Sequence, residues 1–257
     1  MKTPTRRLPA VRLGRRESGL TLIEMCITIT IALFLLGGLA TILQNVRRTY
    51  ANQTQLSQLQ DSERMAMTLI TDVVQSAGYF PNPAINTVSA ALPQVGTTFV
   101  ATQSITGVQA AVAPEDSISI RYMTADKDGI LNCLGTSNTT GAPVTYTNTF
   151  SLTSLDATGT RSLQCKVSDG VNTTTQPLVS GLLNMKVFYG VKRNTATTDS
   201  NVDSYVRAND MLAADWLNIS AIRIIFTFQN PLAAPTSPKT ITFERVVAVM
   251  NRAGVTL

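Results

Sequence analysis

Residues 14–25 read "GRRESGLTLIEM", where a basic stretch and a glycine lead directly into a long apolar segment. This segment runs from residue 20 to residue 43, and Glu24 is its only charged residue. A helix of this length, at about 1.5 Å per residue, is about 36 Å long and can cross a bilayer core of about 30 Å. The segment therefore predicts a transmembrane helix, and it is too long for an ordinary cleaved secretory signal.

Glu24 is unusual because a charged side chain near the end of a membrane helix costs about 1–3 kcal/mol and needs a partner. If the chain is cut between Gly19 and Leu20, a new α-amino group with a pKa of about 8 appears close to Glu24. That ammonium can pair with the carboxylate either within one chain or between neighbouring helices at the same depth.

The net charge of +5 lies entirely in the N-terminal tail, because residues 20–257 are balanced. A basic tail beside an apolar segment is a topology signal, so nucleic acid is not an expected partner. The positive-inside rule predicts a cytoplasmic N-terminus and an external C-terminal part. The basic residues of this tail are Lys2, Arg6, Arg7, Arg12, Arg15 and Arg16.

The composition argues against an enzyme and against a cofactor or metal site. The chain has no histidine, which removes the commonest general base and metal ligand, and it has no phosphate-binding glycine motif. The stretch "DKDG", from Asp126 through Asp128 to Gly129, lacks the remaining acids of a calcium loop and is interpreted as a turn. Four later aspartates are interpreted as parts of a solvated loop: Asp199, Asp203, Asp210 and Asp215.

Residues 47–77 predict a continuation of the same helix, because they contain no proline or glycine and show one apolar stripe. The stripe consists of Leu56, Leu59, Ala66, Ile70, Val73 and Ala77. Gly78 and the prolines of "AGYFPNP" are expected to end the helix. The organisation predicted is a basic leader over 1–19, a long helix over 20–77 with its membrane segment over 20–43, and a globular head over 78–257.

The head predicts an antiparallel β-sheet, because several segments alternate apolar and polar residues. These segments are 118–123, 183–191, 219–229 and 240–249, with two more strands around a turn at Asp156–Gly159. The last two strands are expected to form a hairpin. Residues 86–114 show weak periodicity, and only a short strand over Thr97–Ala101 is suggested there.

The chain has three cysteines. Cys26 lies in the membrane segment and is expected to be a free thiol. Cys133 and Cys165 lie in the part predicted to be external, where disulfides persist, so a bridge between them is favoured over two buried thiols. The bridge would close a loop of about 30 residues and contribute about 3–4 kcal/mol to stability.

The stretch "SGLTLIEM" resembles the type IV prepilin signature, a basic leader that ends in glycine and precedes Thr-Leu-Ile-Glu. The resemblance implies that a membrane prepilin peptidase cuts after Gly19 and N-methylates Leu20. It also implies that Glu24 pairs with the amino terminus of a neighbouring subunit during assembly. Leu20 departs from the family's more frequent phenylalanine at this position.

The head resembles the PilW family of minor pilins, in the "NCLG" to "LQC" arrangement and in the late segments "DWLNISAIRIIFTF" and "ITFERVVAVMNR". This resemblance implies the α+β pilin fold and a structural role in type IV pilus assembly, with other pilins and inner-membrane lipid as partners. It places the chain in the bacterial inner membrane with a periplasmic head, and then in the pilus fibre. The alternatives are a J-type minor pseudopilin of type II secretion, a tip adhesin and a simple membrane-anchored binding module.

Overall fold

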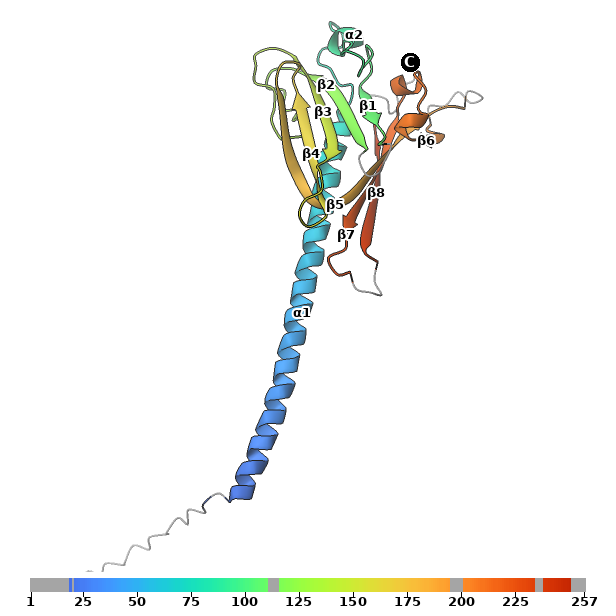
Figure 1. The fold of residues 1–257 in the computed structure, drawn as a ribbon. Coiled ribbons are helices and arrows are strands. Elements are labelled where there is room, and N and C mark those ends of the chain that lie inside the picture. The colour runs from blue at the N-terminus through green and yellow to red at the C-terminus, as the bar shows by residue number, and fades with distance from the viewer. Residues whose placement is uncertain (1–18, 20, 111–115, 195–200, 234–237, 251–257) are drawn as a thin grey trace, which may run out of the picture. The chain divides into compact units, whose positions relative to one another are not determined.

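The computed structural model describes residues 19, 21–110, 116–194, 201–233 and 238–250. The chain forms two compact units, Met1–Ala51 and Asn52–Leu257, and each is considered separately. Helix α1 (Leu22–Gln75) supplies the described helix of the first unit and continues into the second. The second unit adds an antiparallel sheet, so the fold is α+β and consistent with a pilin, as predicted (Figure 1).

The described residues of the second unit form one eight-stranded sheet in the order β1-β2-β3-β4-β5-β7-β8, with β6 paired to β5. All the strand pairs are antiparallel. The strands are β1 (Ile105–Val108), β2 (Ser117–Thr124), β3 (Val144–Leu152), β4 (Arg161–Ser168), β5 (Thr173–Val191), β6 (Ser204–Val206), β7 (Ala221–Gln229) and β8 (Thr240–Ala248). The short helices are α2 (Val88–Ala91), η1 (Ala208–Asp210) and η2 (Asp215–Leu217).

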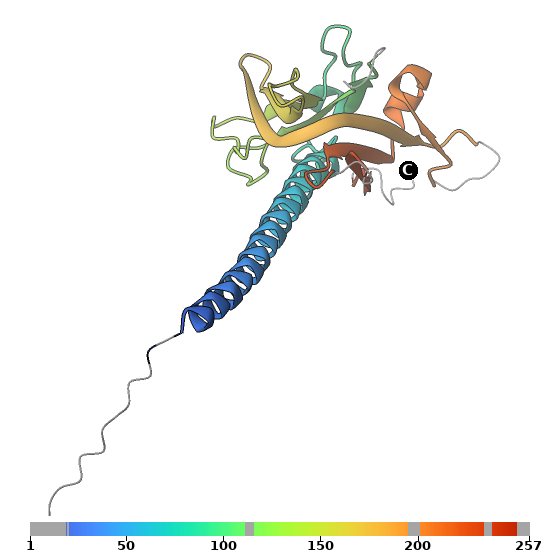
Figure 2. The same cartoon turned by 60° about the horizontal axis from the view of Figure 1, so that its bottom comes forward.

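Strand β5 connects the two halves of this sheet. It pairs first with β4 and then with β7, and Figure 2 shows it as one long curved strand. Gly181 has a φ of +85°, and the register shifts beside it at Leu182. A glycine at positive φ beside a register shift is typical of a β-bulge, which bends a strand and increases its twist. The sheet therefore curves at this point.

The alternation of apolar residues predicted β2, β7, β8 and the hairpin of the last two strands correctly to within two residues. The turn at Asp156–Gly159 between β3 and β4 is also confirmed, and hydrogen bonds from Thr158 and Thr160 hold the pKa of Asp156 at about 2. Strand β5 begins at Thr173, whereas the predicted strand began at Leu183. The prediction missed the first half of β5, because its polar residues and Pro177 do not show the alternation of a half-buried strand.

The strand suggested over Thr97–Ala101 is wrong. The structure has only an isolated bridge there, between Val95 and Phe99, and the nearby strand is β1. The backbone of this segment is held by a side chain from β2, as described below.

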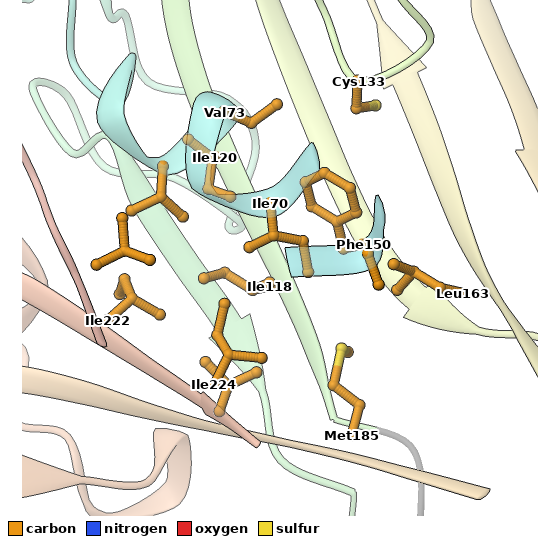
Figure 3. Close-up of a cluster of buried hydrophobic side chains, with 14 of the residues drawn as sticks. Ile70, Val73, Ile118, Ile120, Cys133, Phe150, Leu163, Met185, Ile222 and Ile224 are labelled. Atoms are coloured by element: carbon orange, nitrogen blue, oxygen red, sulfur yellow. The ribbon is translucent and has the colours of Figure 1, made fainter. Parts of the chain in front are cut away.

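The core forms where the C-terminal part of α1 packs on the concave face of the sheet. Ala66, Ile70 and Val73 are almost completely buried, which confirms that part of the predicted stripe. Leu56 is 37% exposed, whereas Met67 and Val74 are buried and widen the stripe. Figure 3 shows Ile70 and Val73 among side chains that come from five strands, namely Ile118, Ile120, Phe150, Leu163, Met185, Ile222 and Ile224.

Helix α1 ends at Gln75, and Gly78 adopts a φ of +75°, as expected of a glycine that stops a helix. The N–H of Gly78 donates to the carbonyl of Arg121 at 3.0 Å, and the N–H of Met123 donates to the carbonyl of Tyr79 at 2.8 Å. The chain that leaves the helix is therefore fixed directly to strand β2.

Arg121 on β2 organises residues 92–104, the segment with weak periodicity. Its side chain is fully buried, and its guanidinium donates to the carbonyls of Leu92, Pro93, Val100 and Gln103. The guanidinium carbon also lies 4.5 Å from the centre of the Phe99 ring. Burial lowers the pKa of Arg121 to about 10, so the group stays charged at neutral pH. Backbone dipoles and an aromatic ring therefore compensate a buried cation.

Arg121→Met is expected to lower the free energy of unfolding by about 2–4 kcal/mol, because it keeps the apolar volume but removes the donor from four carbonyls, of which those of Pro93 and Gln103 have no other donor among the described residues. Urea unfolding measures this loss, and limited proteolysis should show new cleavage within residues 92–104. Lys166→Met, at an exposed position of the same sheet, is the control and should change neither. Equal stability of the two variants would contradict the role given to Arg121.

Candidate functional site

The start of helix α1 contains Glu24, the carboxylate singled out by the sequence. The backbone N–H of Glu24 donates to the carbonyl of Thr21 at 3.1 Å and to its side-chain oxygen at 3.4 Å. Thr21 therefore caps the helix, and Thr21-Leu22-Ile23-Glu24 has the sequence of a capping box. Sequence reasoning missed this local role, although the Thr-x-x-Glu spacing is its signal.

The carboxylate of Glu24 has no hydrogen bond or ion pair to any residue that the structure describes. It lies in the first helical turn, where the helix dipole favours a negative charge, but this gives only about 0.3–1 kcal/mol. Gly19 is exposed, and a side chain placed there would meet no other atom within 4 Å. Leu20, the predicted methylation site, lies outside the described residues, as does the leader over 1–18.

The apolar half of α1 is unburied within the chain. All its side chains from Leu22 to Tyr50 are exposed, and Phe34 is 82% exposed. Among the described residues, α1 is the one helix long and apolar enough to cross a membrane. An exposed apolar surface of this size needs lipid or other apolar helices around it.

Three threonines interrupt this apolar surface without leaving free donors. The side-chain hydroxyls of Thr28, Thr30 and Thr41 donate to backbone carbonyls one turn earlier, at 2.9, 2.7 and 2.9 Å. Such bonds lower the cost of placing a hydroxyl in lipid, because the donor is already satisfied. Cys26 is a free, exposed cysteine on the same stretch.

The aspartates of the head close turns and pair with arginine. Asp203 accepts the backbone N–H groups of Arg193 and Asn194, which lower the pKa of its carboxyl. Asp215 binds the Arg193 guanidinium at 2.6 Å, and the same guanidinium donates to the carbonyl of Asp210. Asp199 lies outside the described residues.

The "DKDG" segment is a turn, with Lys127 at a φ of +56°. Asp128 accepts the N–H groups of Ala125 and Ile130, and Asp126 accepts the N–H of Gly141. Across the part of the chain that the structure describes, no three His, Cys, Asp or Glu residues come together in a group that could hold a metal ion.

The structure contains the Cys133–Cys165 disulfide, with 6.3 Å between the two Cα atoms. Both residues are buried, and the bridge joins the loop after β2 to strand β4. The N–H of Cys133 donates to the side chain of buried Asn148 on β3 at 2.9 Å. The disulfide therefore anchors a loop that has little regular structure of its own.

Residues 149–250 match the family model described as type IV pilus-assembly protein W (PilW). This part of the head, about two-fifths of the chain, is therefore similar to the PilW family. No curated protein matches the chain. The family and the apolar helix fit a membrane-anchored protein of type IV pilus assembly that interacts with other pilus components.

The matched residues 149–250, called the PilW segment below, begin within β3 and include all the strands that follow. Cys165 lies inside this segment. Outside it, Asp116 supplies a buried carboxylate that sequence reasoning missed. Asp116 binds Arg207, inside the segment, at 2.6 Å, and accepts the N–H of Val187 at 3.0 Å. The pair therefore fixes the PilW segment to the preceding part of the head. Its residues are far apart in sequence, so no local pattern could reveal it.

Replacing both Cys133 and Cys165 by serine is expected to lower the free energy of unfolding by about 3–4 kcal/mol, because the disulfide reduces the conformational entropy of the unfolded chain. Urea unfolding with and without reductant measures the difference. Cys26→Ser is the control and should leave the reductant effect intact. A wild-type chain whose unfolding midpoint ignores reductant would contradict this account.

Proposed function

We propose that the chain is a structural minor subunit that helps to initiate or assemble a type IV pilus. The observation that carries the proposal is one helix with two environments. Its first half exposes apolar side chains around a carboxylate that has no partner among the described residues, and its second half packs in a head whose residues 149–250 match the PilW family. The apolar side chains of this first half would be removed from water only among lipids or the helices of other subunits. The role proposed is non-enzymatic.

The proposed mechanism starts with a prepilin peptidase, which cuts after Gly19 and methylates the new amino group of Leu20. The basic tail, the adjacent apolar span and the PilW family support this step. Cleavage removes the six basic residues that hold the N-terminus on the cytoplasmic side, and it leaves a cationic amine beside the apolar span. The head lies in the periplasm before the subunit enters the fibre.

Glu24 then provides the register between subunits. A carboxylate in an apolar surrounding is stabilised most by an opposite charge at hydrogen-bonding distance, and the methylated amine of a neighbouring Leu20 has that charge. Helices whose amine and carboxylate are out of register would leave both charges unpaired. Because the matched family is named for pilus assembly, it supports the pilus over a type II secretion pseudopilus.

Glu24→Ala is expected to leave the chain folded and membrane-inserted but to reduce surface pili severely. Glu24 belongs to the compact unit Met1–Ala51 and is exposed there, so it is not part of the buried core that stabilises the head, and the unfolding midpoint of the head should stay unchanged. Pili are counted by shearing and immunoblotting, and insertion is checked by membrane fractionation.

Glu24→Gln and Asp61→Ala are the matched controls. The first keeps the size and the helix cap but removes the charge, so it should fail like Glu24→Ala. The second removes an exposed acid further along the same helix and should assemble normally. Normal piliation with Glu24→Gln would show that assembly does not need the charge of Glu24 and would contradict the pairing.

A further inference from the structure

Strand β8 forms a free edge of the head sheet. All nine of its residues pair with β7 without a register shift. On its other side, no hydrogen bond reaches β8 from the residues that the structure describes. Figure 1 shows β8 at the border of the sheet beside β7. About half of the β8 backbone N–H and C=O groups therefore point away from β7, as antiparallel geometry requires.

The two edges of the sheet differ in how well they could accept another strand. The opposite edge, β1, has only four residues, and Gly107 is one of them. Natural proteins protect sheet edges with short strands, proline, bulges or charged side chains. Strand β8 is long, regular and free of proline, glycine and lysine, so its protection consists of its two charged side chains, Glu244 and Arg245.

The two charges of β8 behave differently. Glu244 lies on the outer face and is held by Arg223 of β7 through two bonds of 2.6 and 2.9 Å. Arg245 lies on the inner face, opposite buried Ile224. Arg245 is exposed, and no residue that the structure describes pairs with it. One charge is therefore compensated within the sheet, and the other is available to a partner.

Apolar side chains lie on the inner face on both sides of Arg245. Val247 is buried, whereas Ile241 and Phe243 are only half-buried at the edge of the core. The Phe243 ring lies 5.8 Å from that of Phe228 in an edge-to-face arrangement. A further strand would cover the exposed parts of Ile241 and Phe243.

We propose that the β8 edge binds an extended segment of another protein by strand addition. The segment has a carboxylate opposite Arg245 and apolar side chains two residues away on either side. Backbone hydrogen bonds would provide affinity, and the inner-face side chains would provide selectivity. The inference rests on the sheet alone and does not depend on the processing or the pilus role.

A second copy of this chain fits the edge poorly. Side chains directly opposite each other in an antiparallel pair lie on the same face of the sheet. Glu244 and Arg245 lie on opposite faces, so two β8 strands that continue one sheet cannot place these charges against each other. Arg245 would stay unpaired or would face another Arg245. A different, acidic segment satisfies it.

The test uses the full chain in detergent and a nine-residue peptide. The peptide has valine at three of its four inner-face positions, glutamate at the position opposite Arg245, and threonine or lysine elsewhere. A second peptide has lysine in place of that glutamate. Fluorescence anisotropy should show roughly fivefold tighter binding of the glutamate peptide, as expected for one cross-strand charge pair. Hydrogen exchange should slow in β8 and not in β1.

Arg245→Glu should reverse this preference while the unfolding midpoint stays the same, because Arg245 is exposed. Lys166→Glu, an exposed charge reversal elsewhere on the sheet, is the control and should keep the wild-type preference. Equal affinity for both peptides, no binding at about 1 mM, or indifference to Arg245→Glu would overturn the proposal. If the chain forms dimers and the peptide dissociates them, the edge binds a second copy of the chain, and this result would also overturn the proposal.

Discussion

Helix α1 buries apolar side chains within the chain only in its second half, and the rest of the structure is built around this constraint. Residues such as Ala66, Ile70 and Val74 are completely buried against the sheet, whereas no residue of α1 before Leu59 is. Burial of a large apolar side chain contributes about 1.5–3 kcal/mol, so each one left exposed in water forgoes that contribution. Lipid first, and then other helices, would remove this cost. Under the proposed function, the single carboxylate in that apolar half would then determine which arrangement of neighbouring helices is favourable.

The head is stabilised by polar interactions that connect distant parts of the chain. Arg121 fixes residues 92–104 through four carbonyls, Asp116 joins Arg207, and Arg193 joins Asp215. Each is a charge that is buried or partly buried and has its partners in place, which is the condition under which such a group is tolerated. These aspartates and arginines are occupied in structural bonds, so Arg245 stands out as an exposed cation beside an open strand edge.

Local patterns predicted the elements whose identity is local. The helical stripe gave Ala66, Ile70 and Val73, and period-two alternation gave β2, β7 and β8, because a buried face imposes its period on the residues. The first half of β5 was missed since it is polar and contains Pro177, and its partner β4 determines it. Residues 92–104 could not be predicted, because a side chain from β2 holds their backbone. The Thr21–Glu24 cap is local, and its Thr-x-x-Glu spacing is readable in the sequence.

Under the proposed function, cleavage creates the amine that Glu24 requires, so the N-terminus of the protein in its native membrane is the decisive observation. Intact mass and N-terminal sequencing should show a chain that begins at N-methyl-Leu20, and Gly19→Val should abolish that product. A wild-type chain that still carries Met1–Gly19 would mean that the apolar segment is only an anchor. The pairing role of Glu24 would then be contradicted, although the similarity of residues 149–250 to the PilW family would remain.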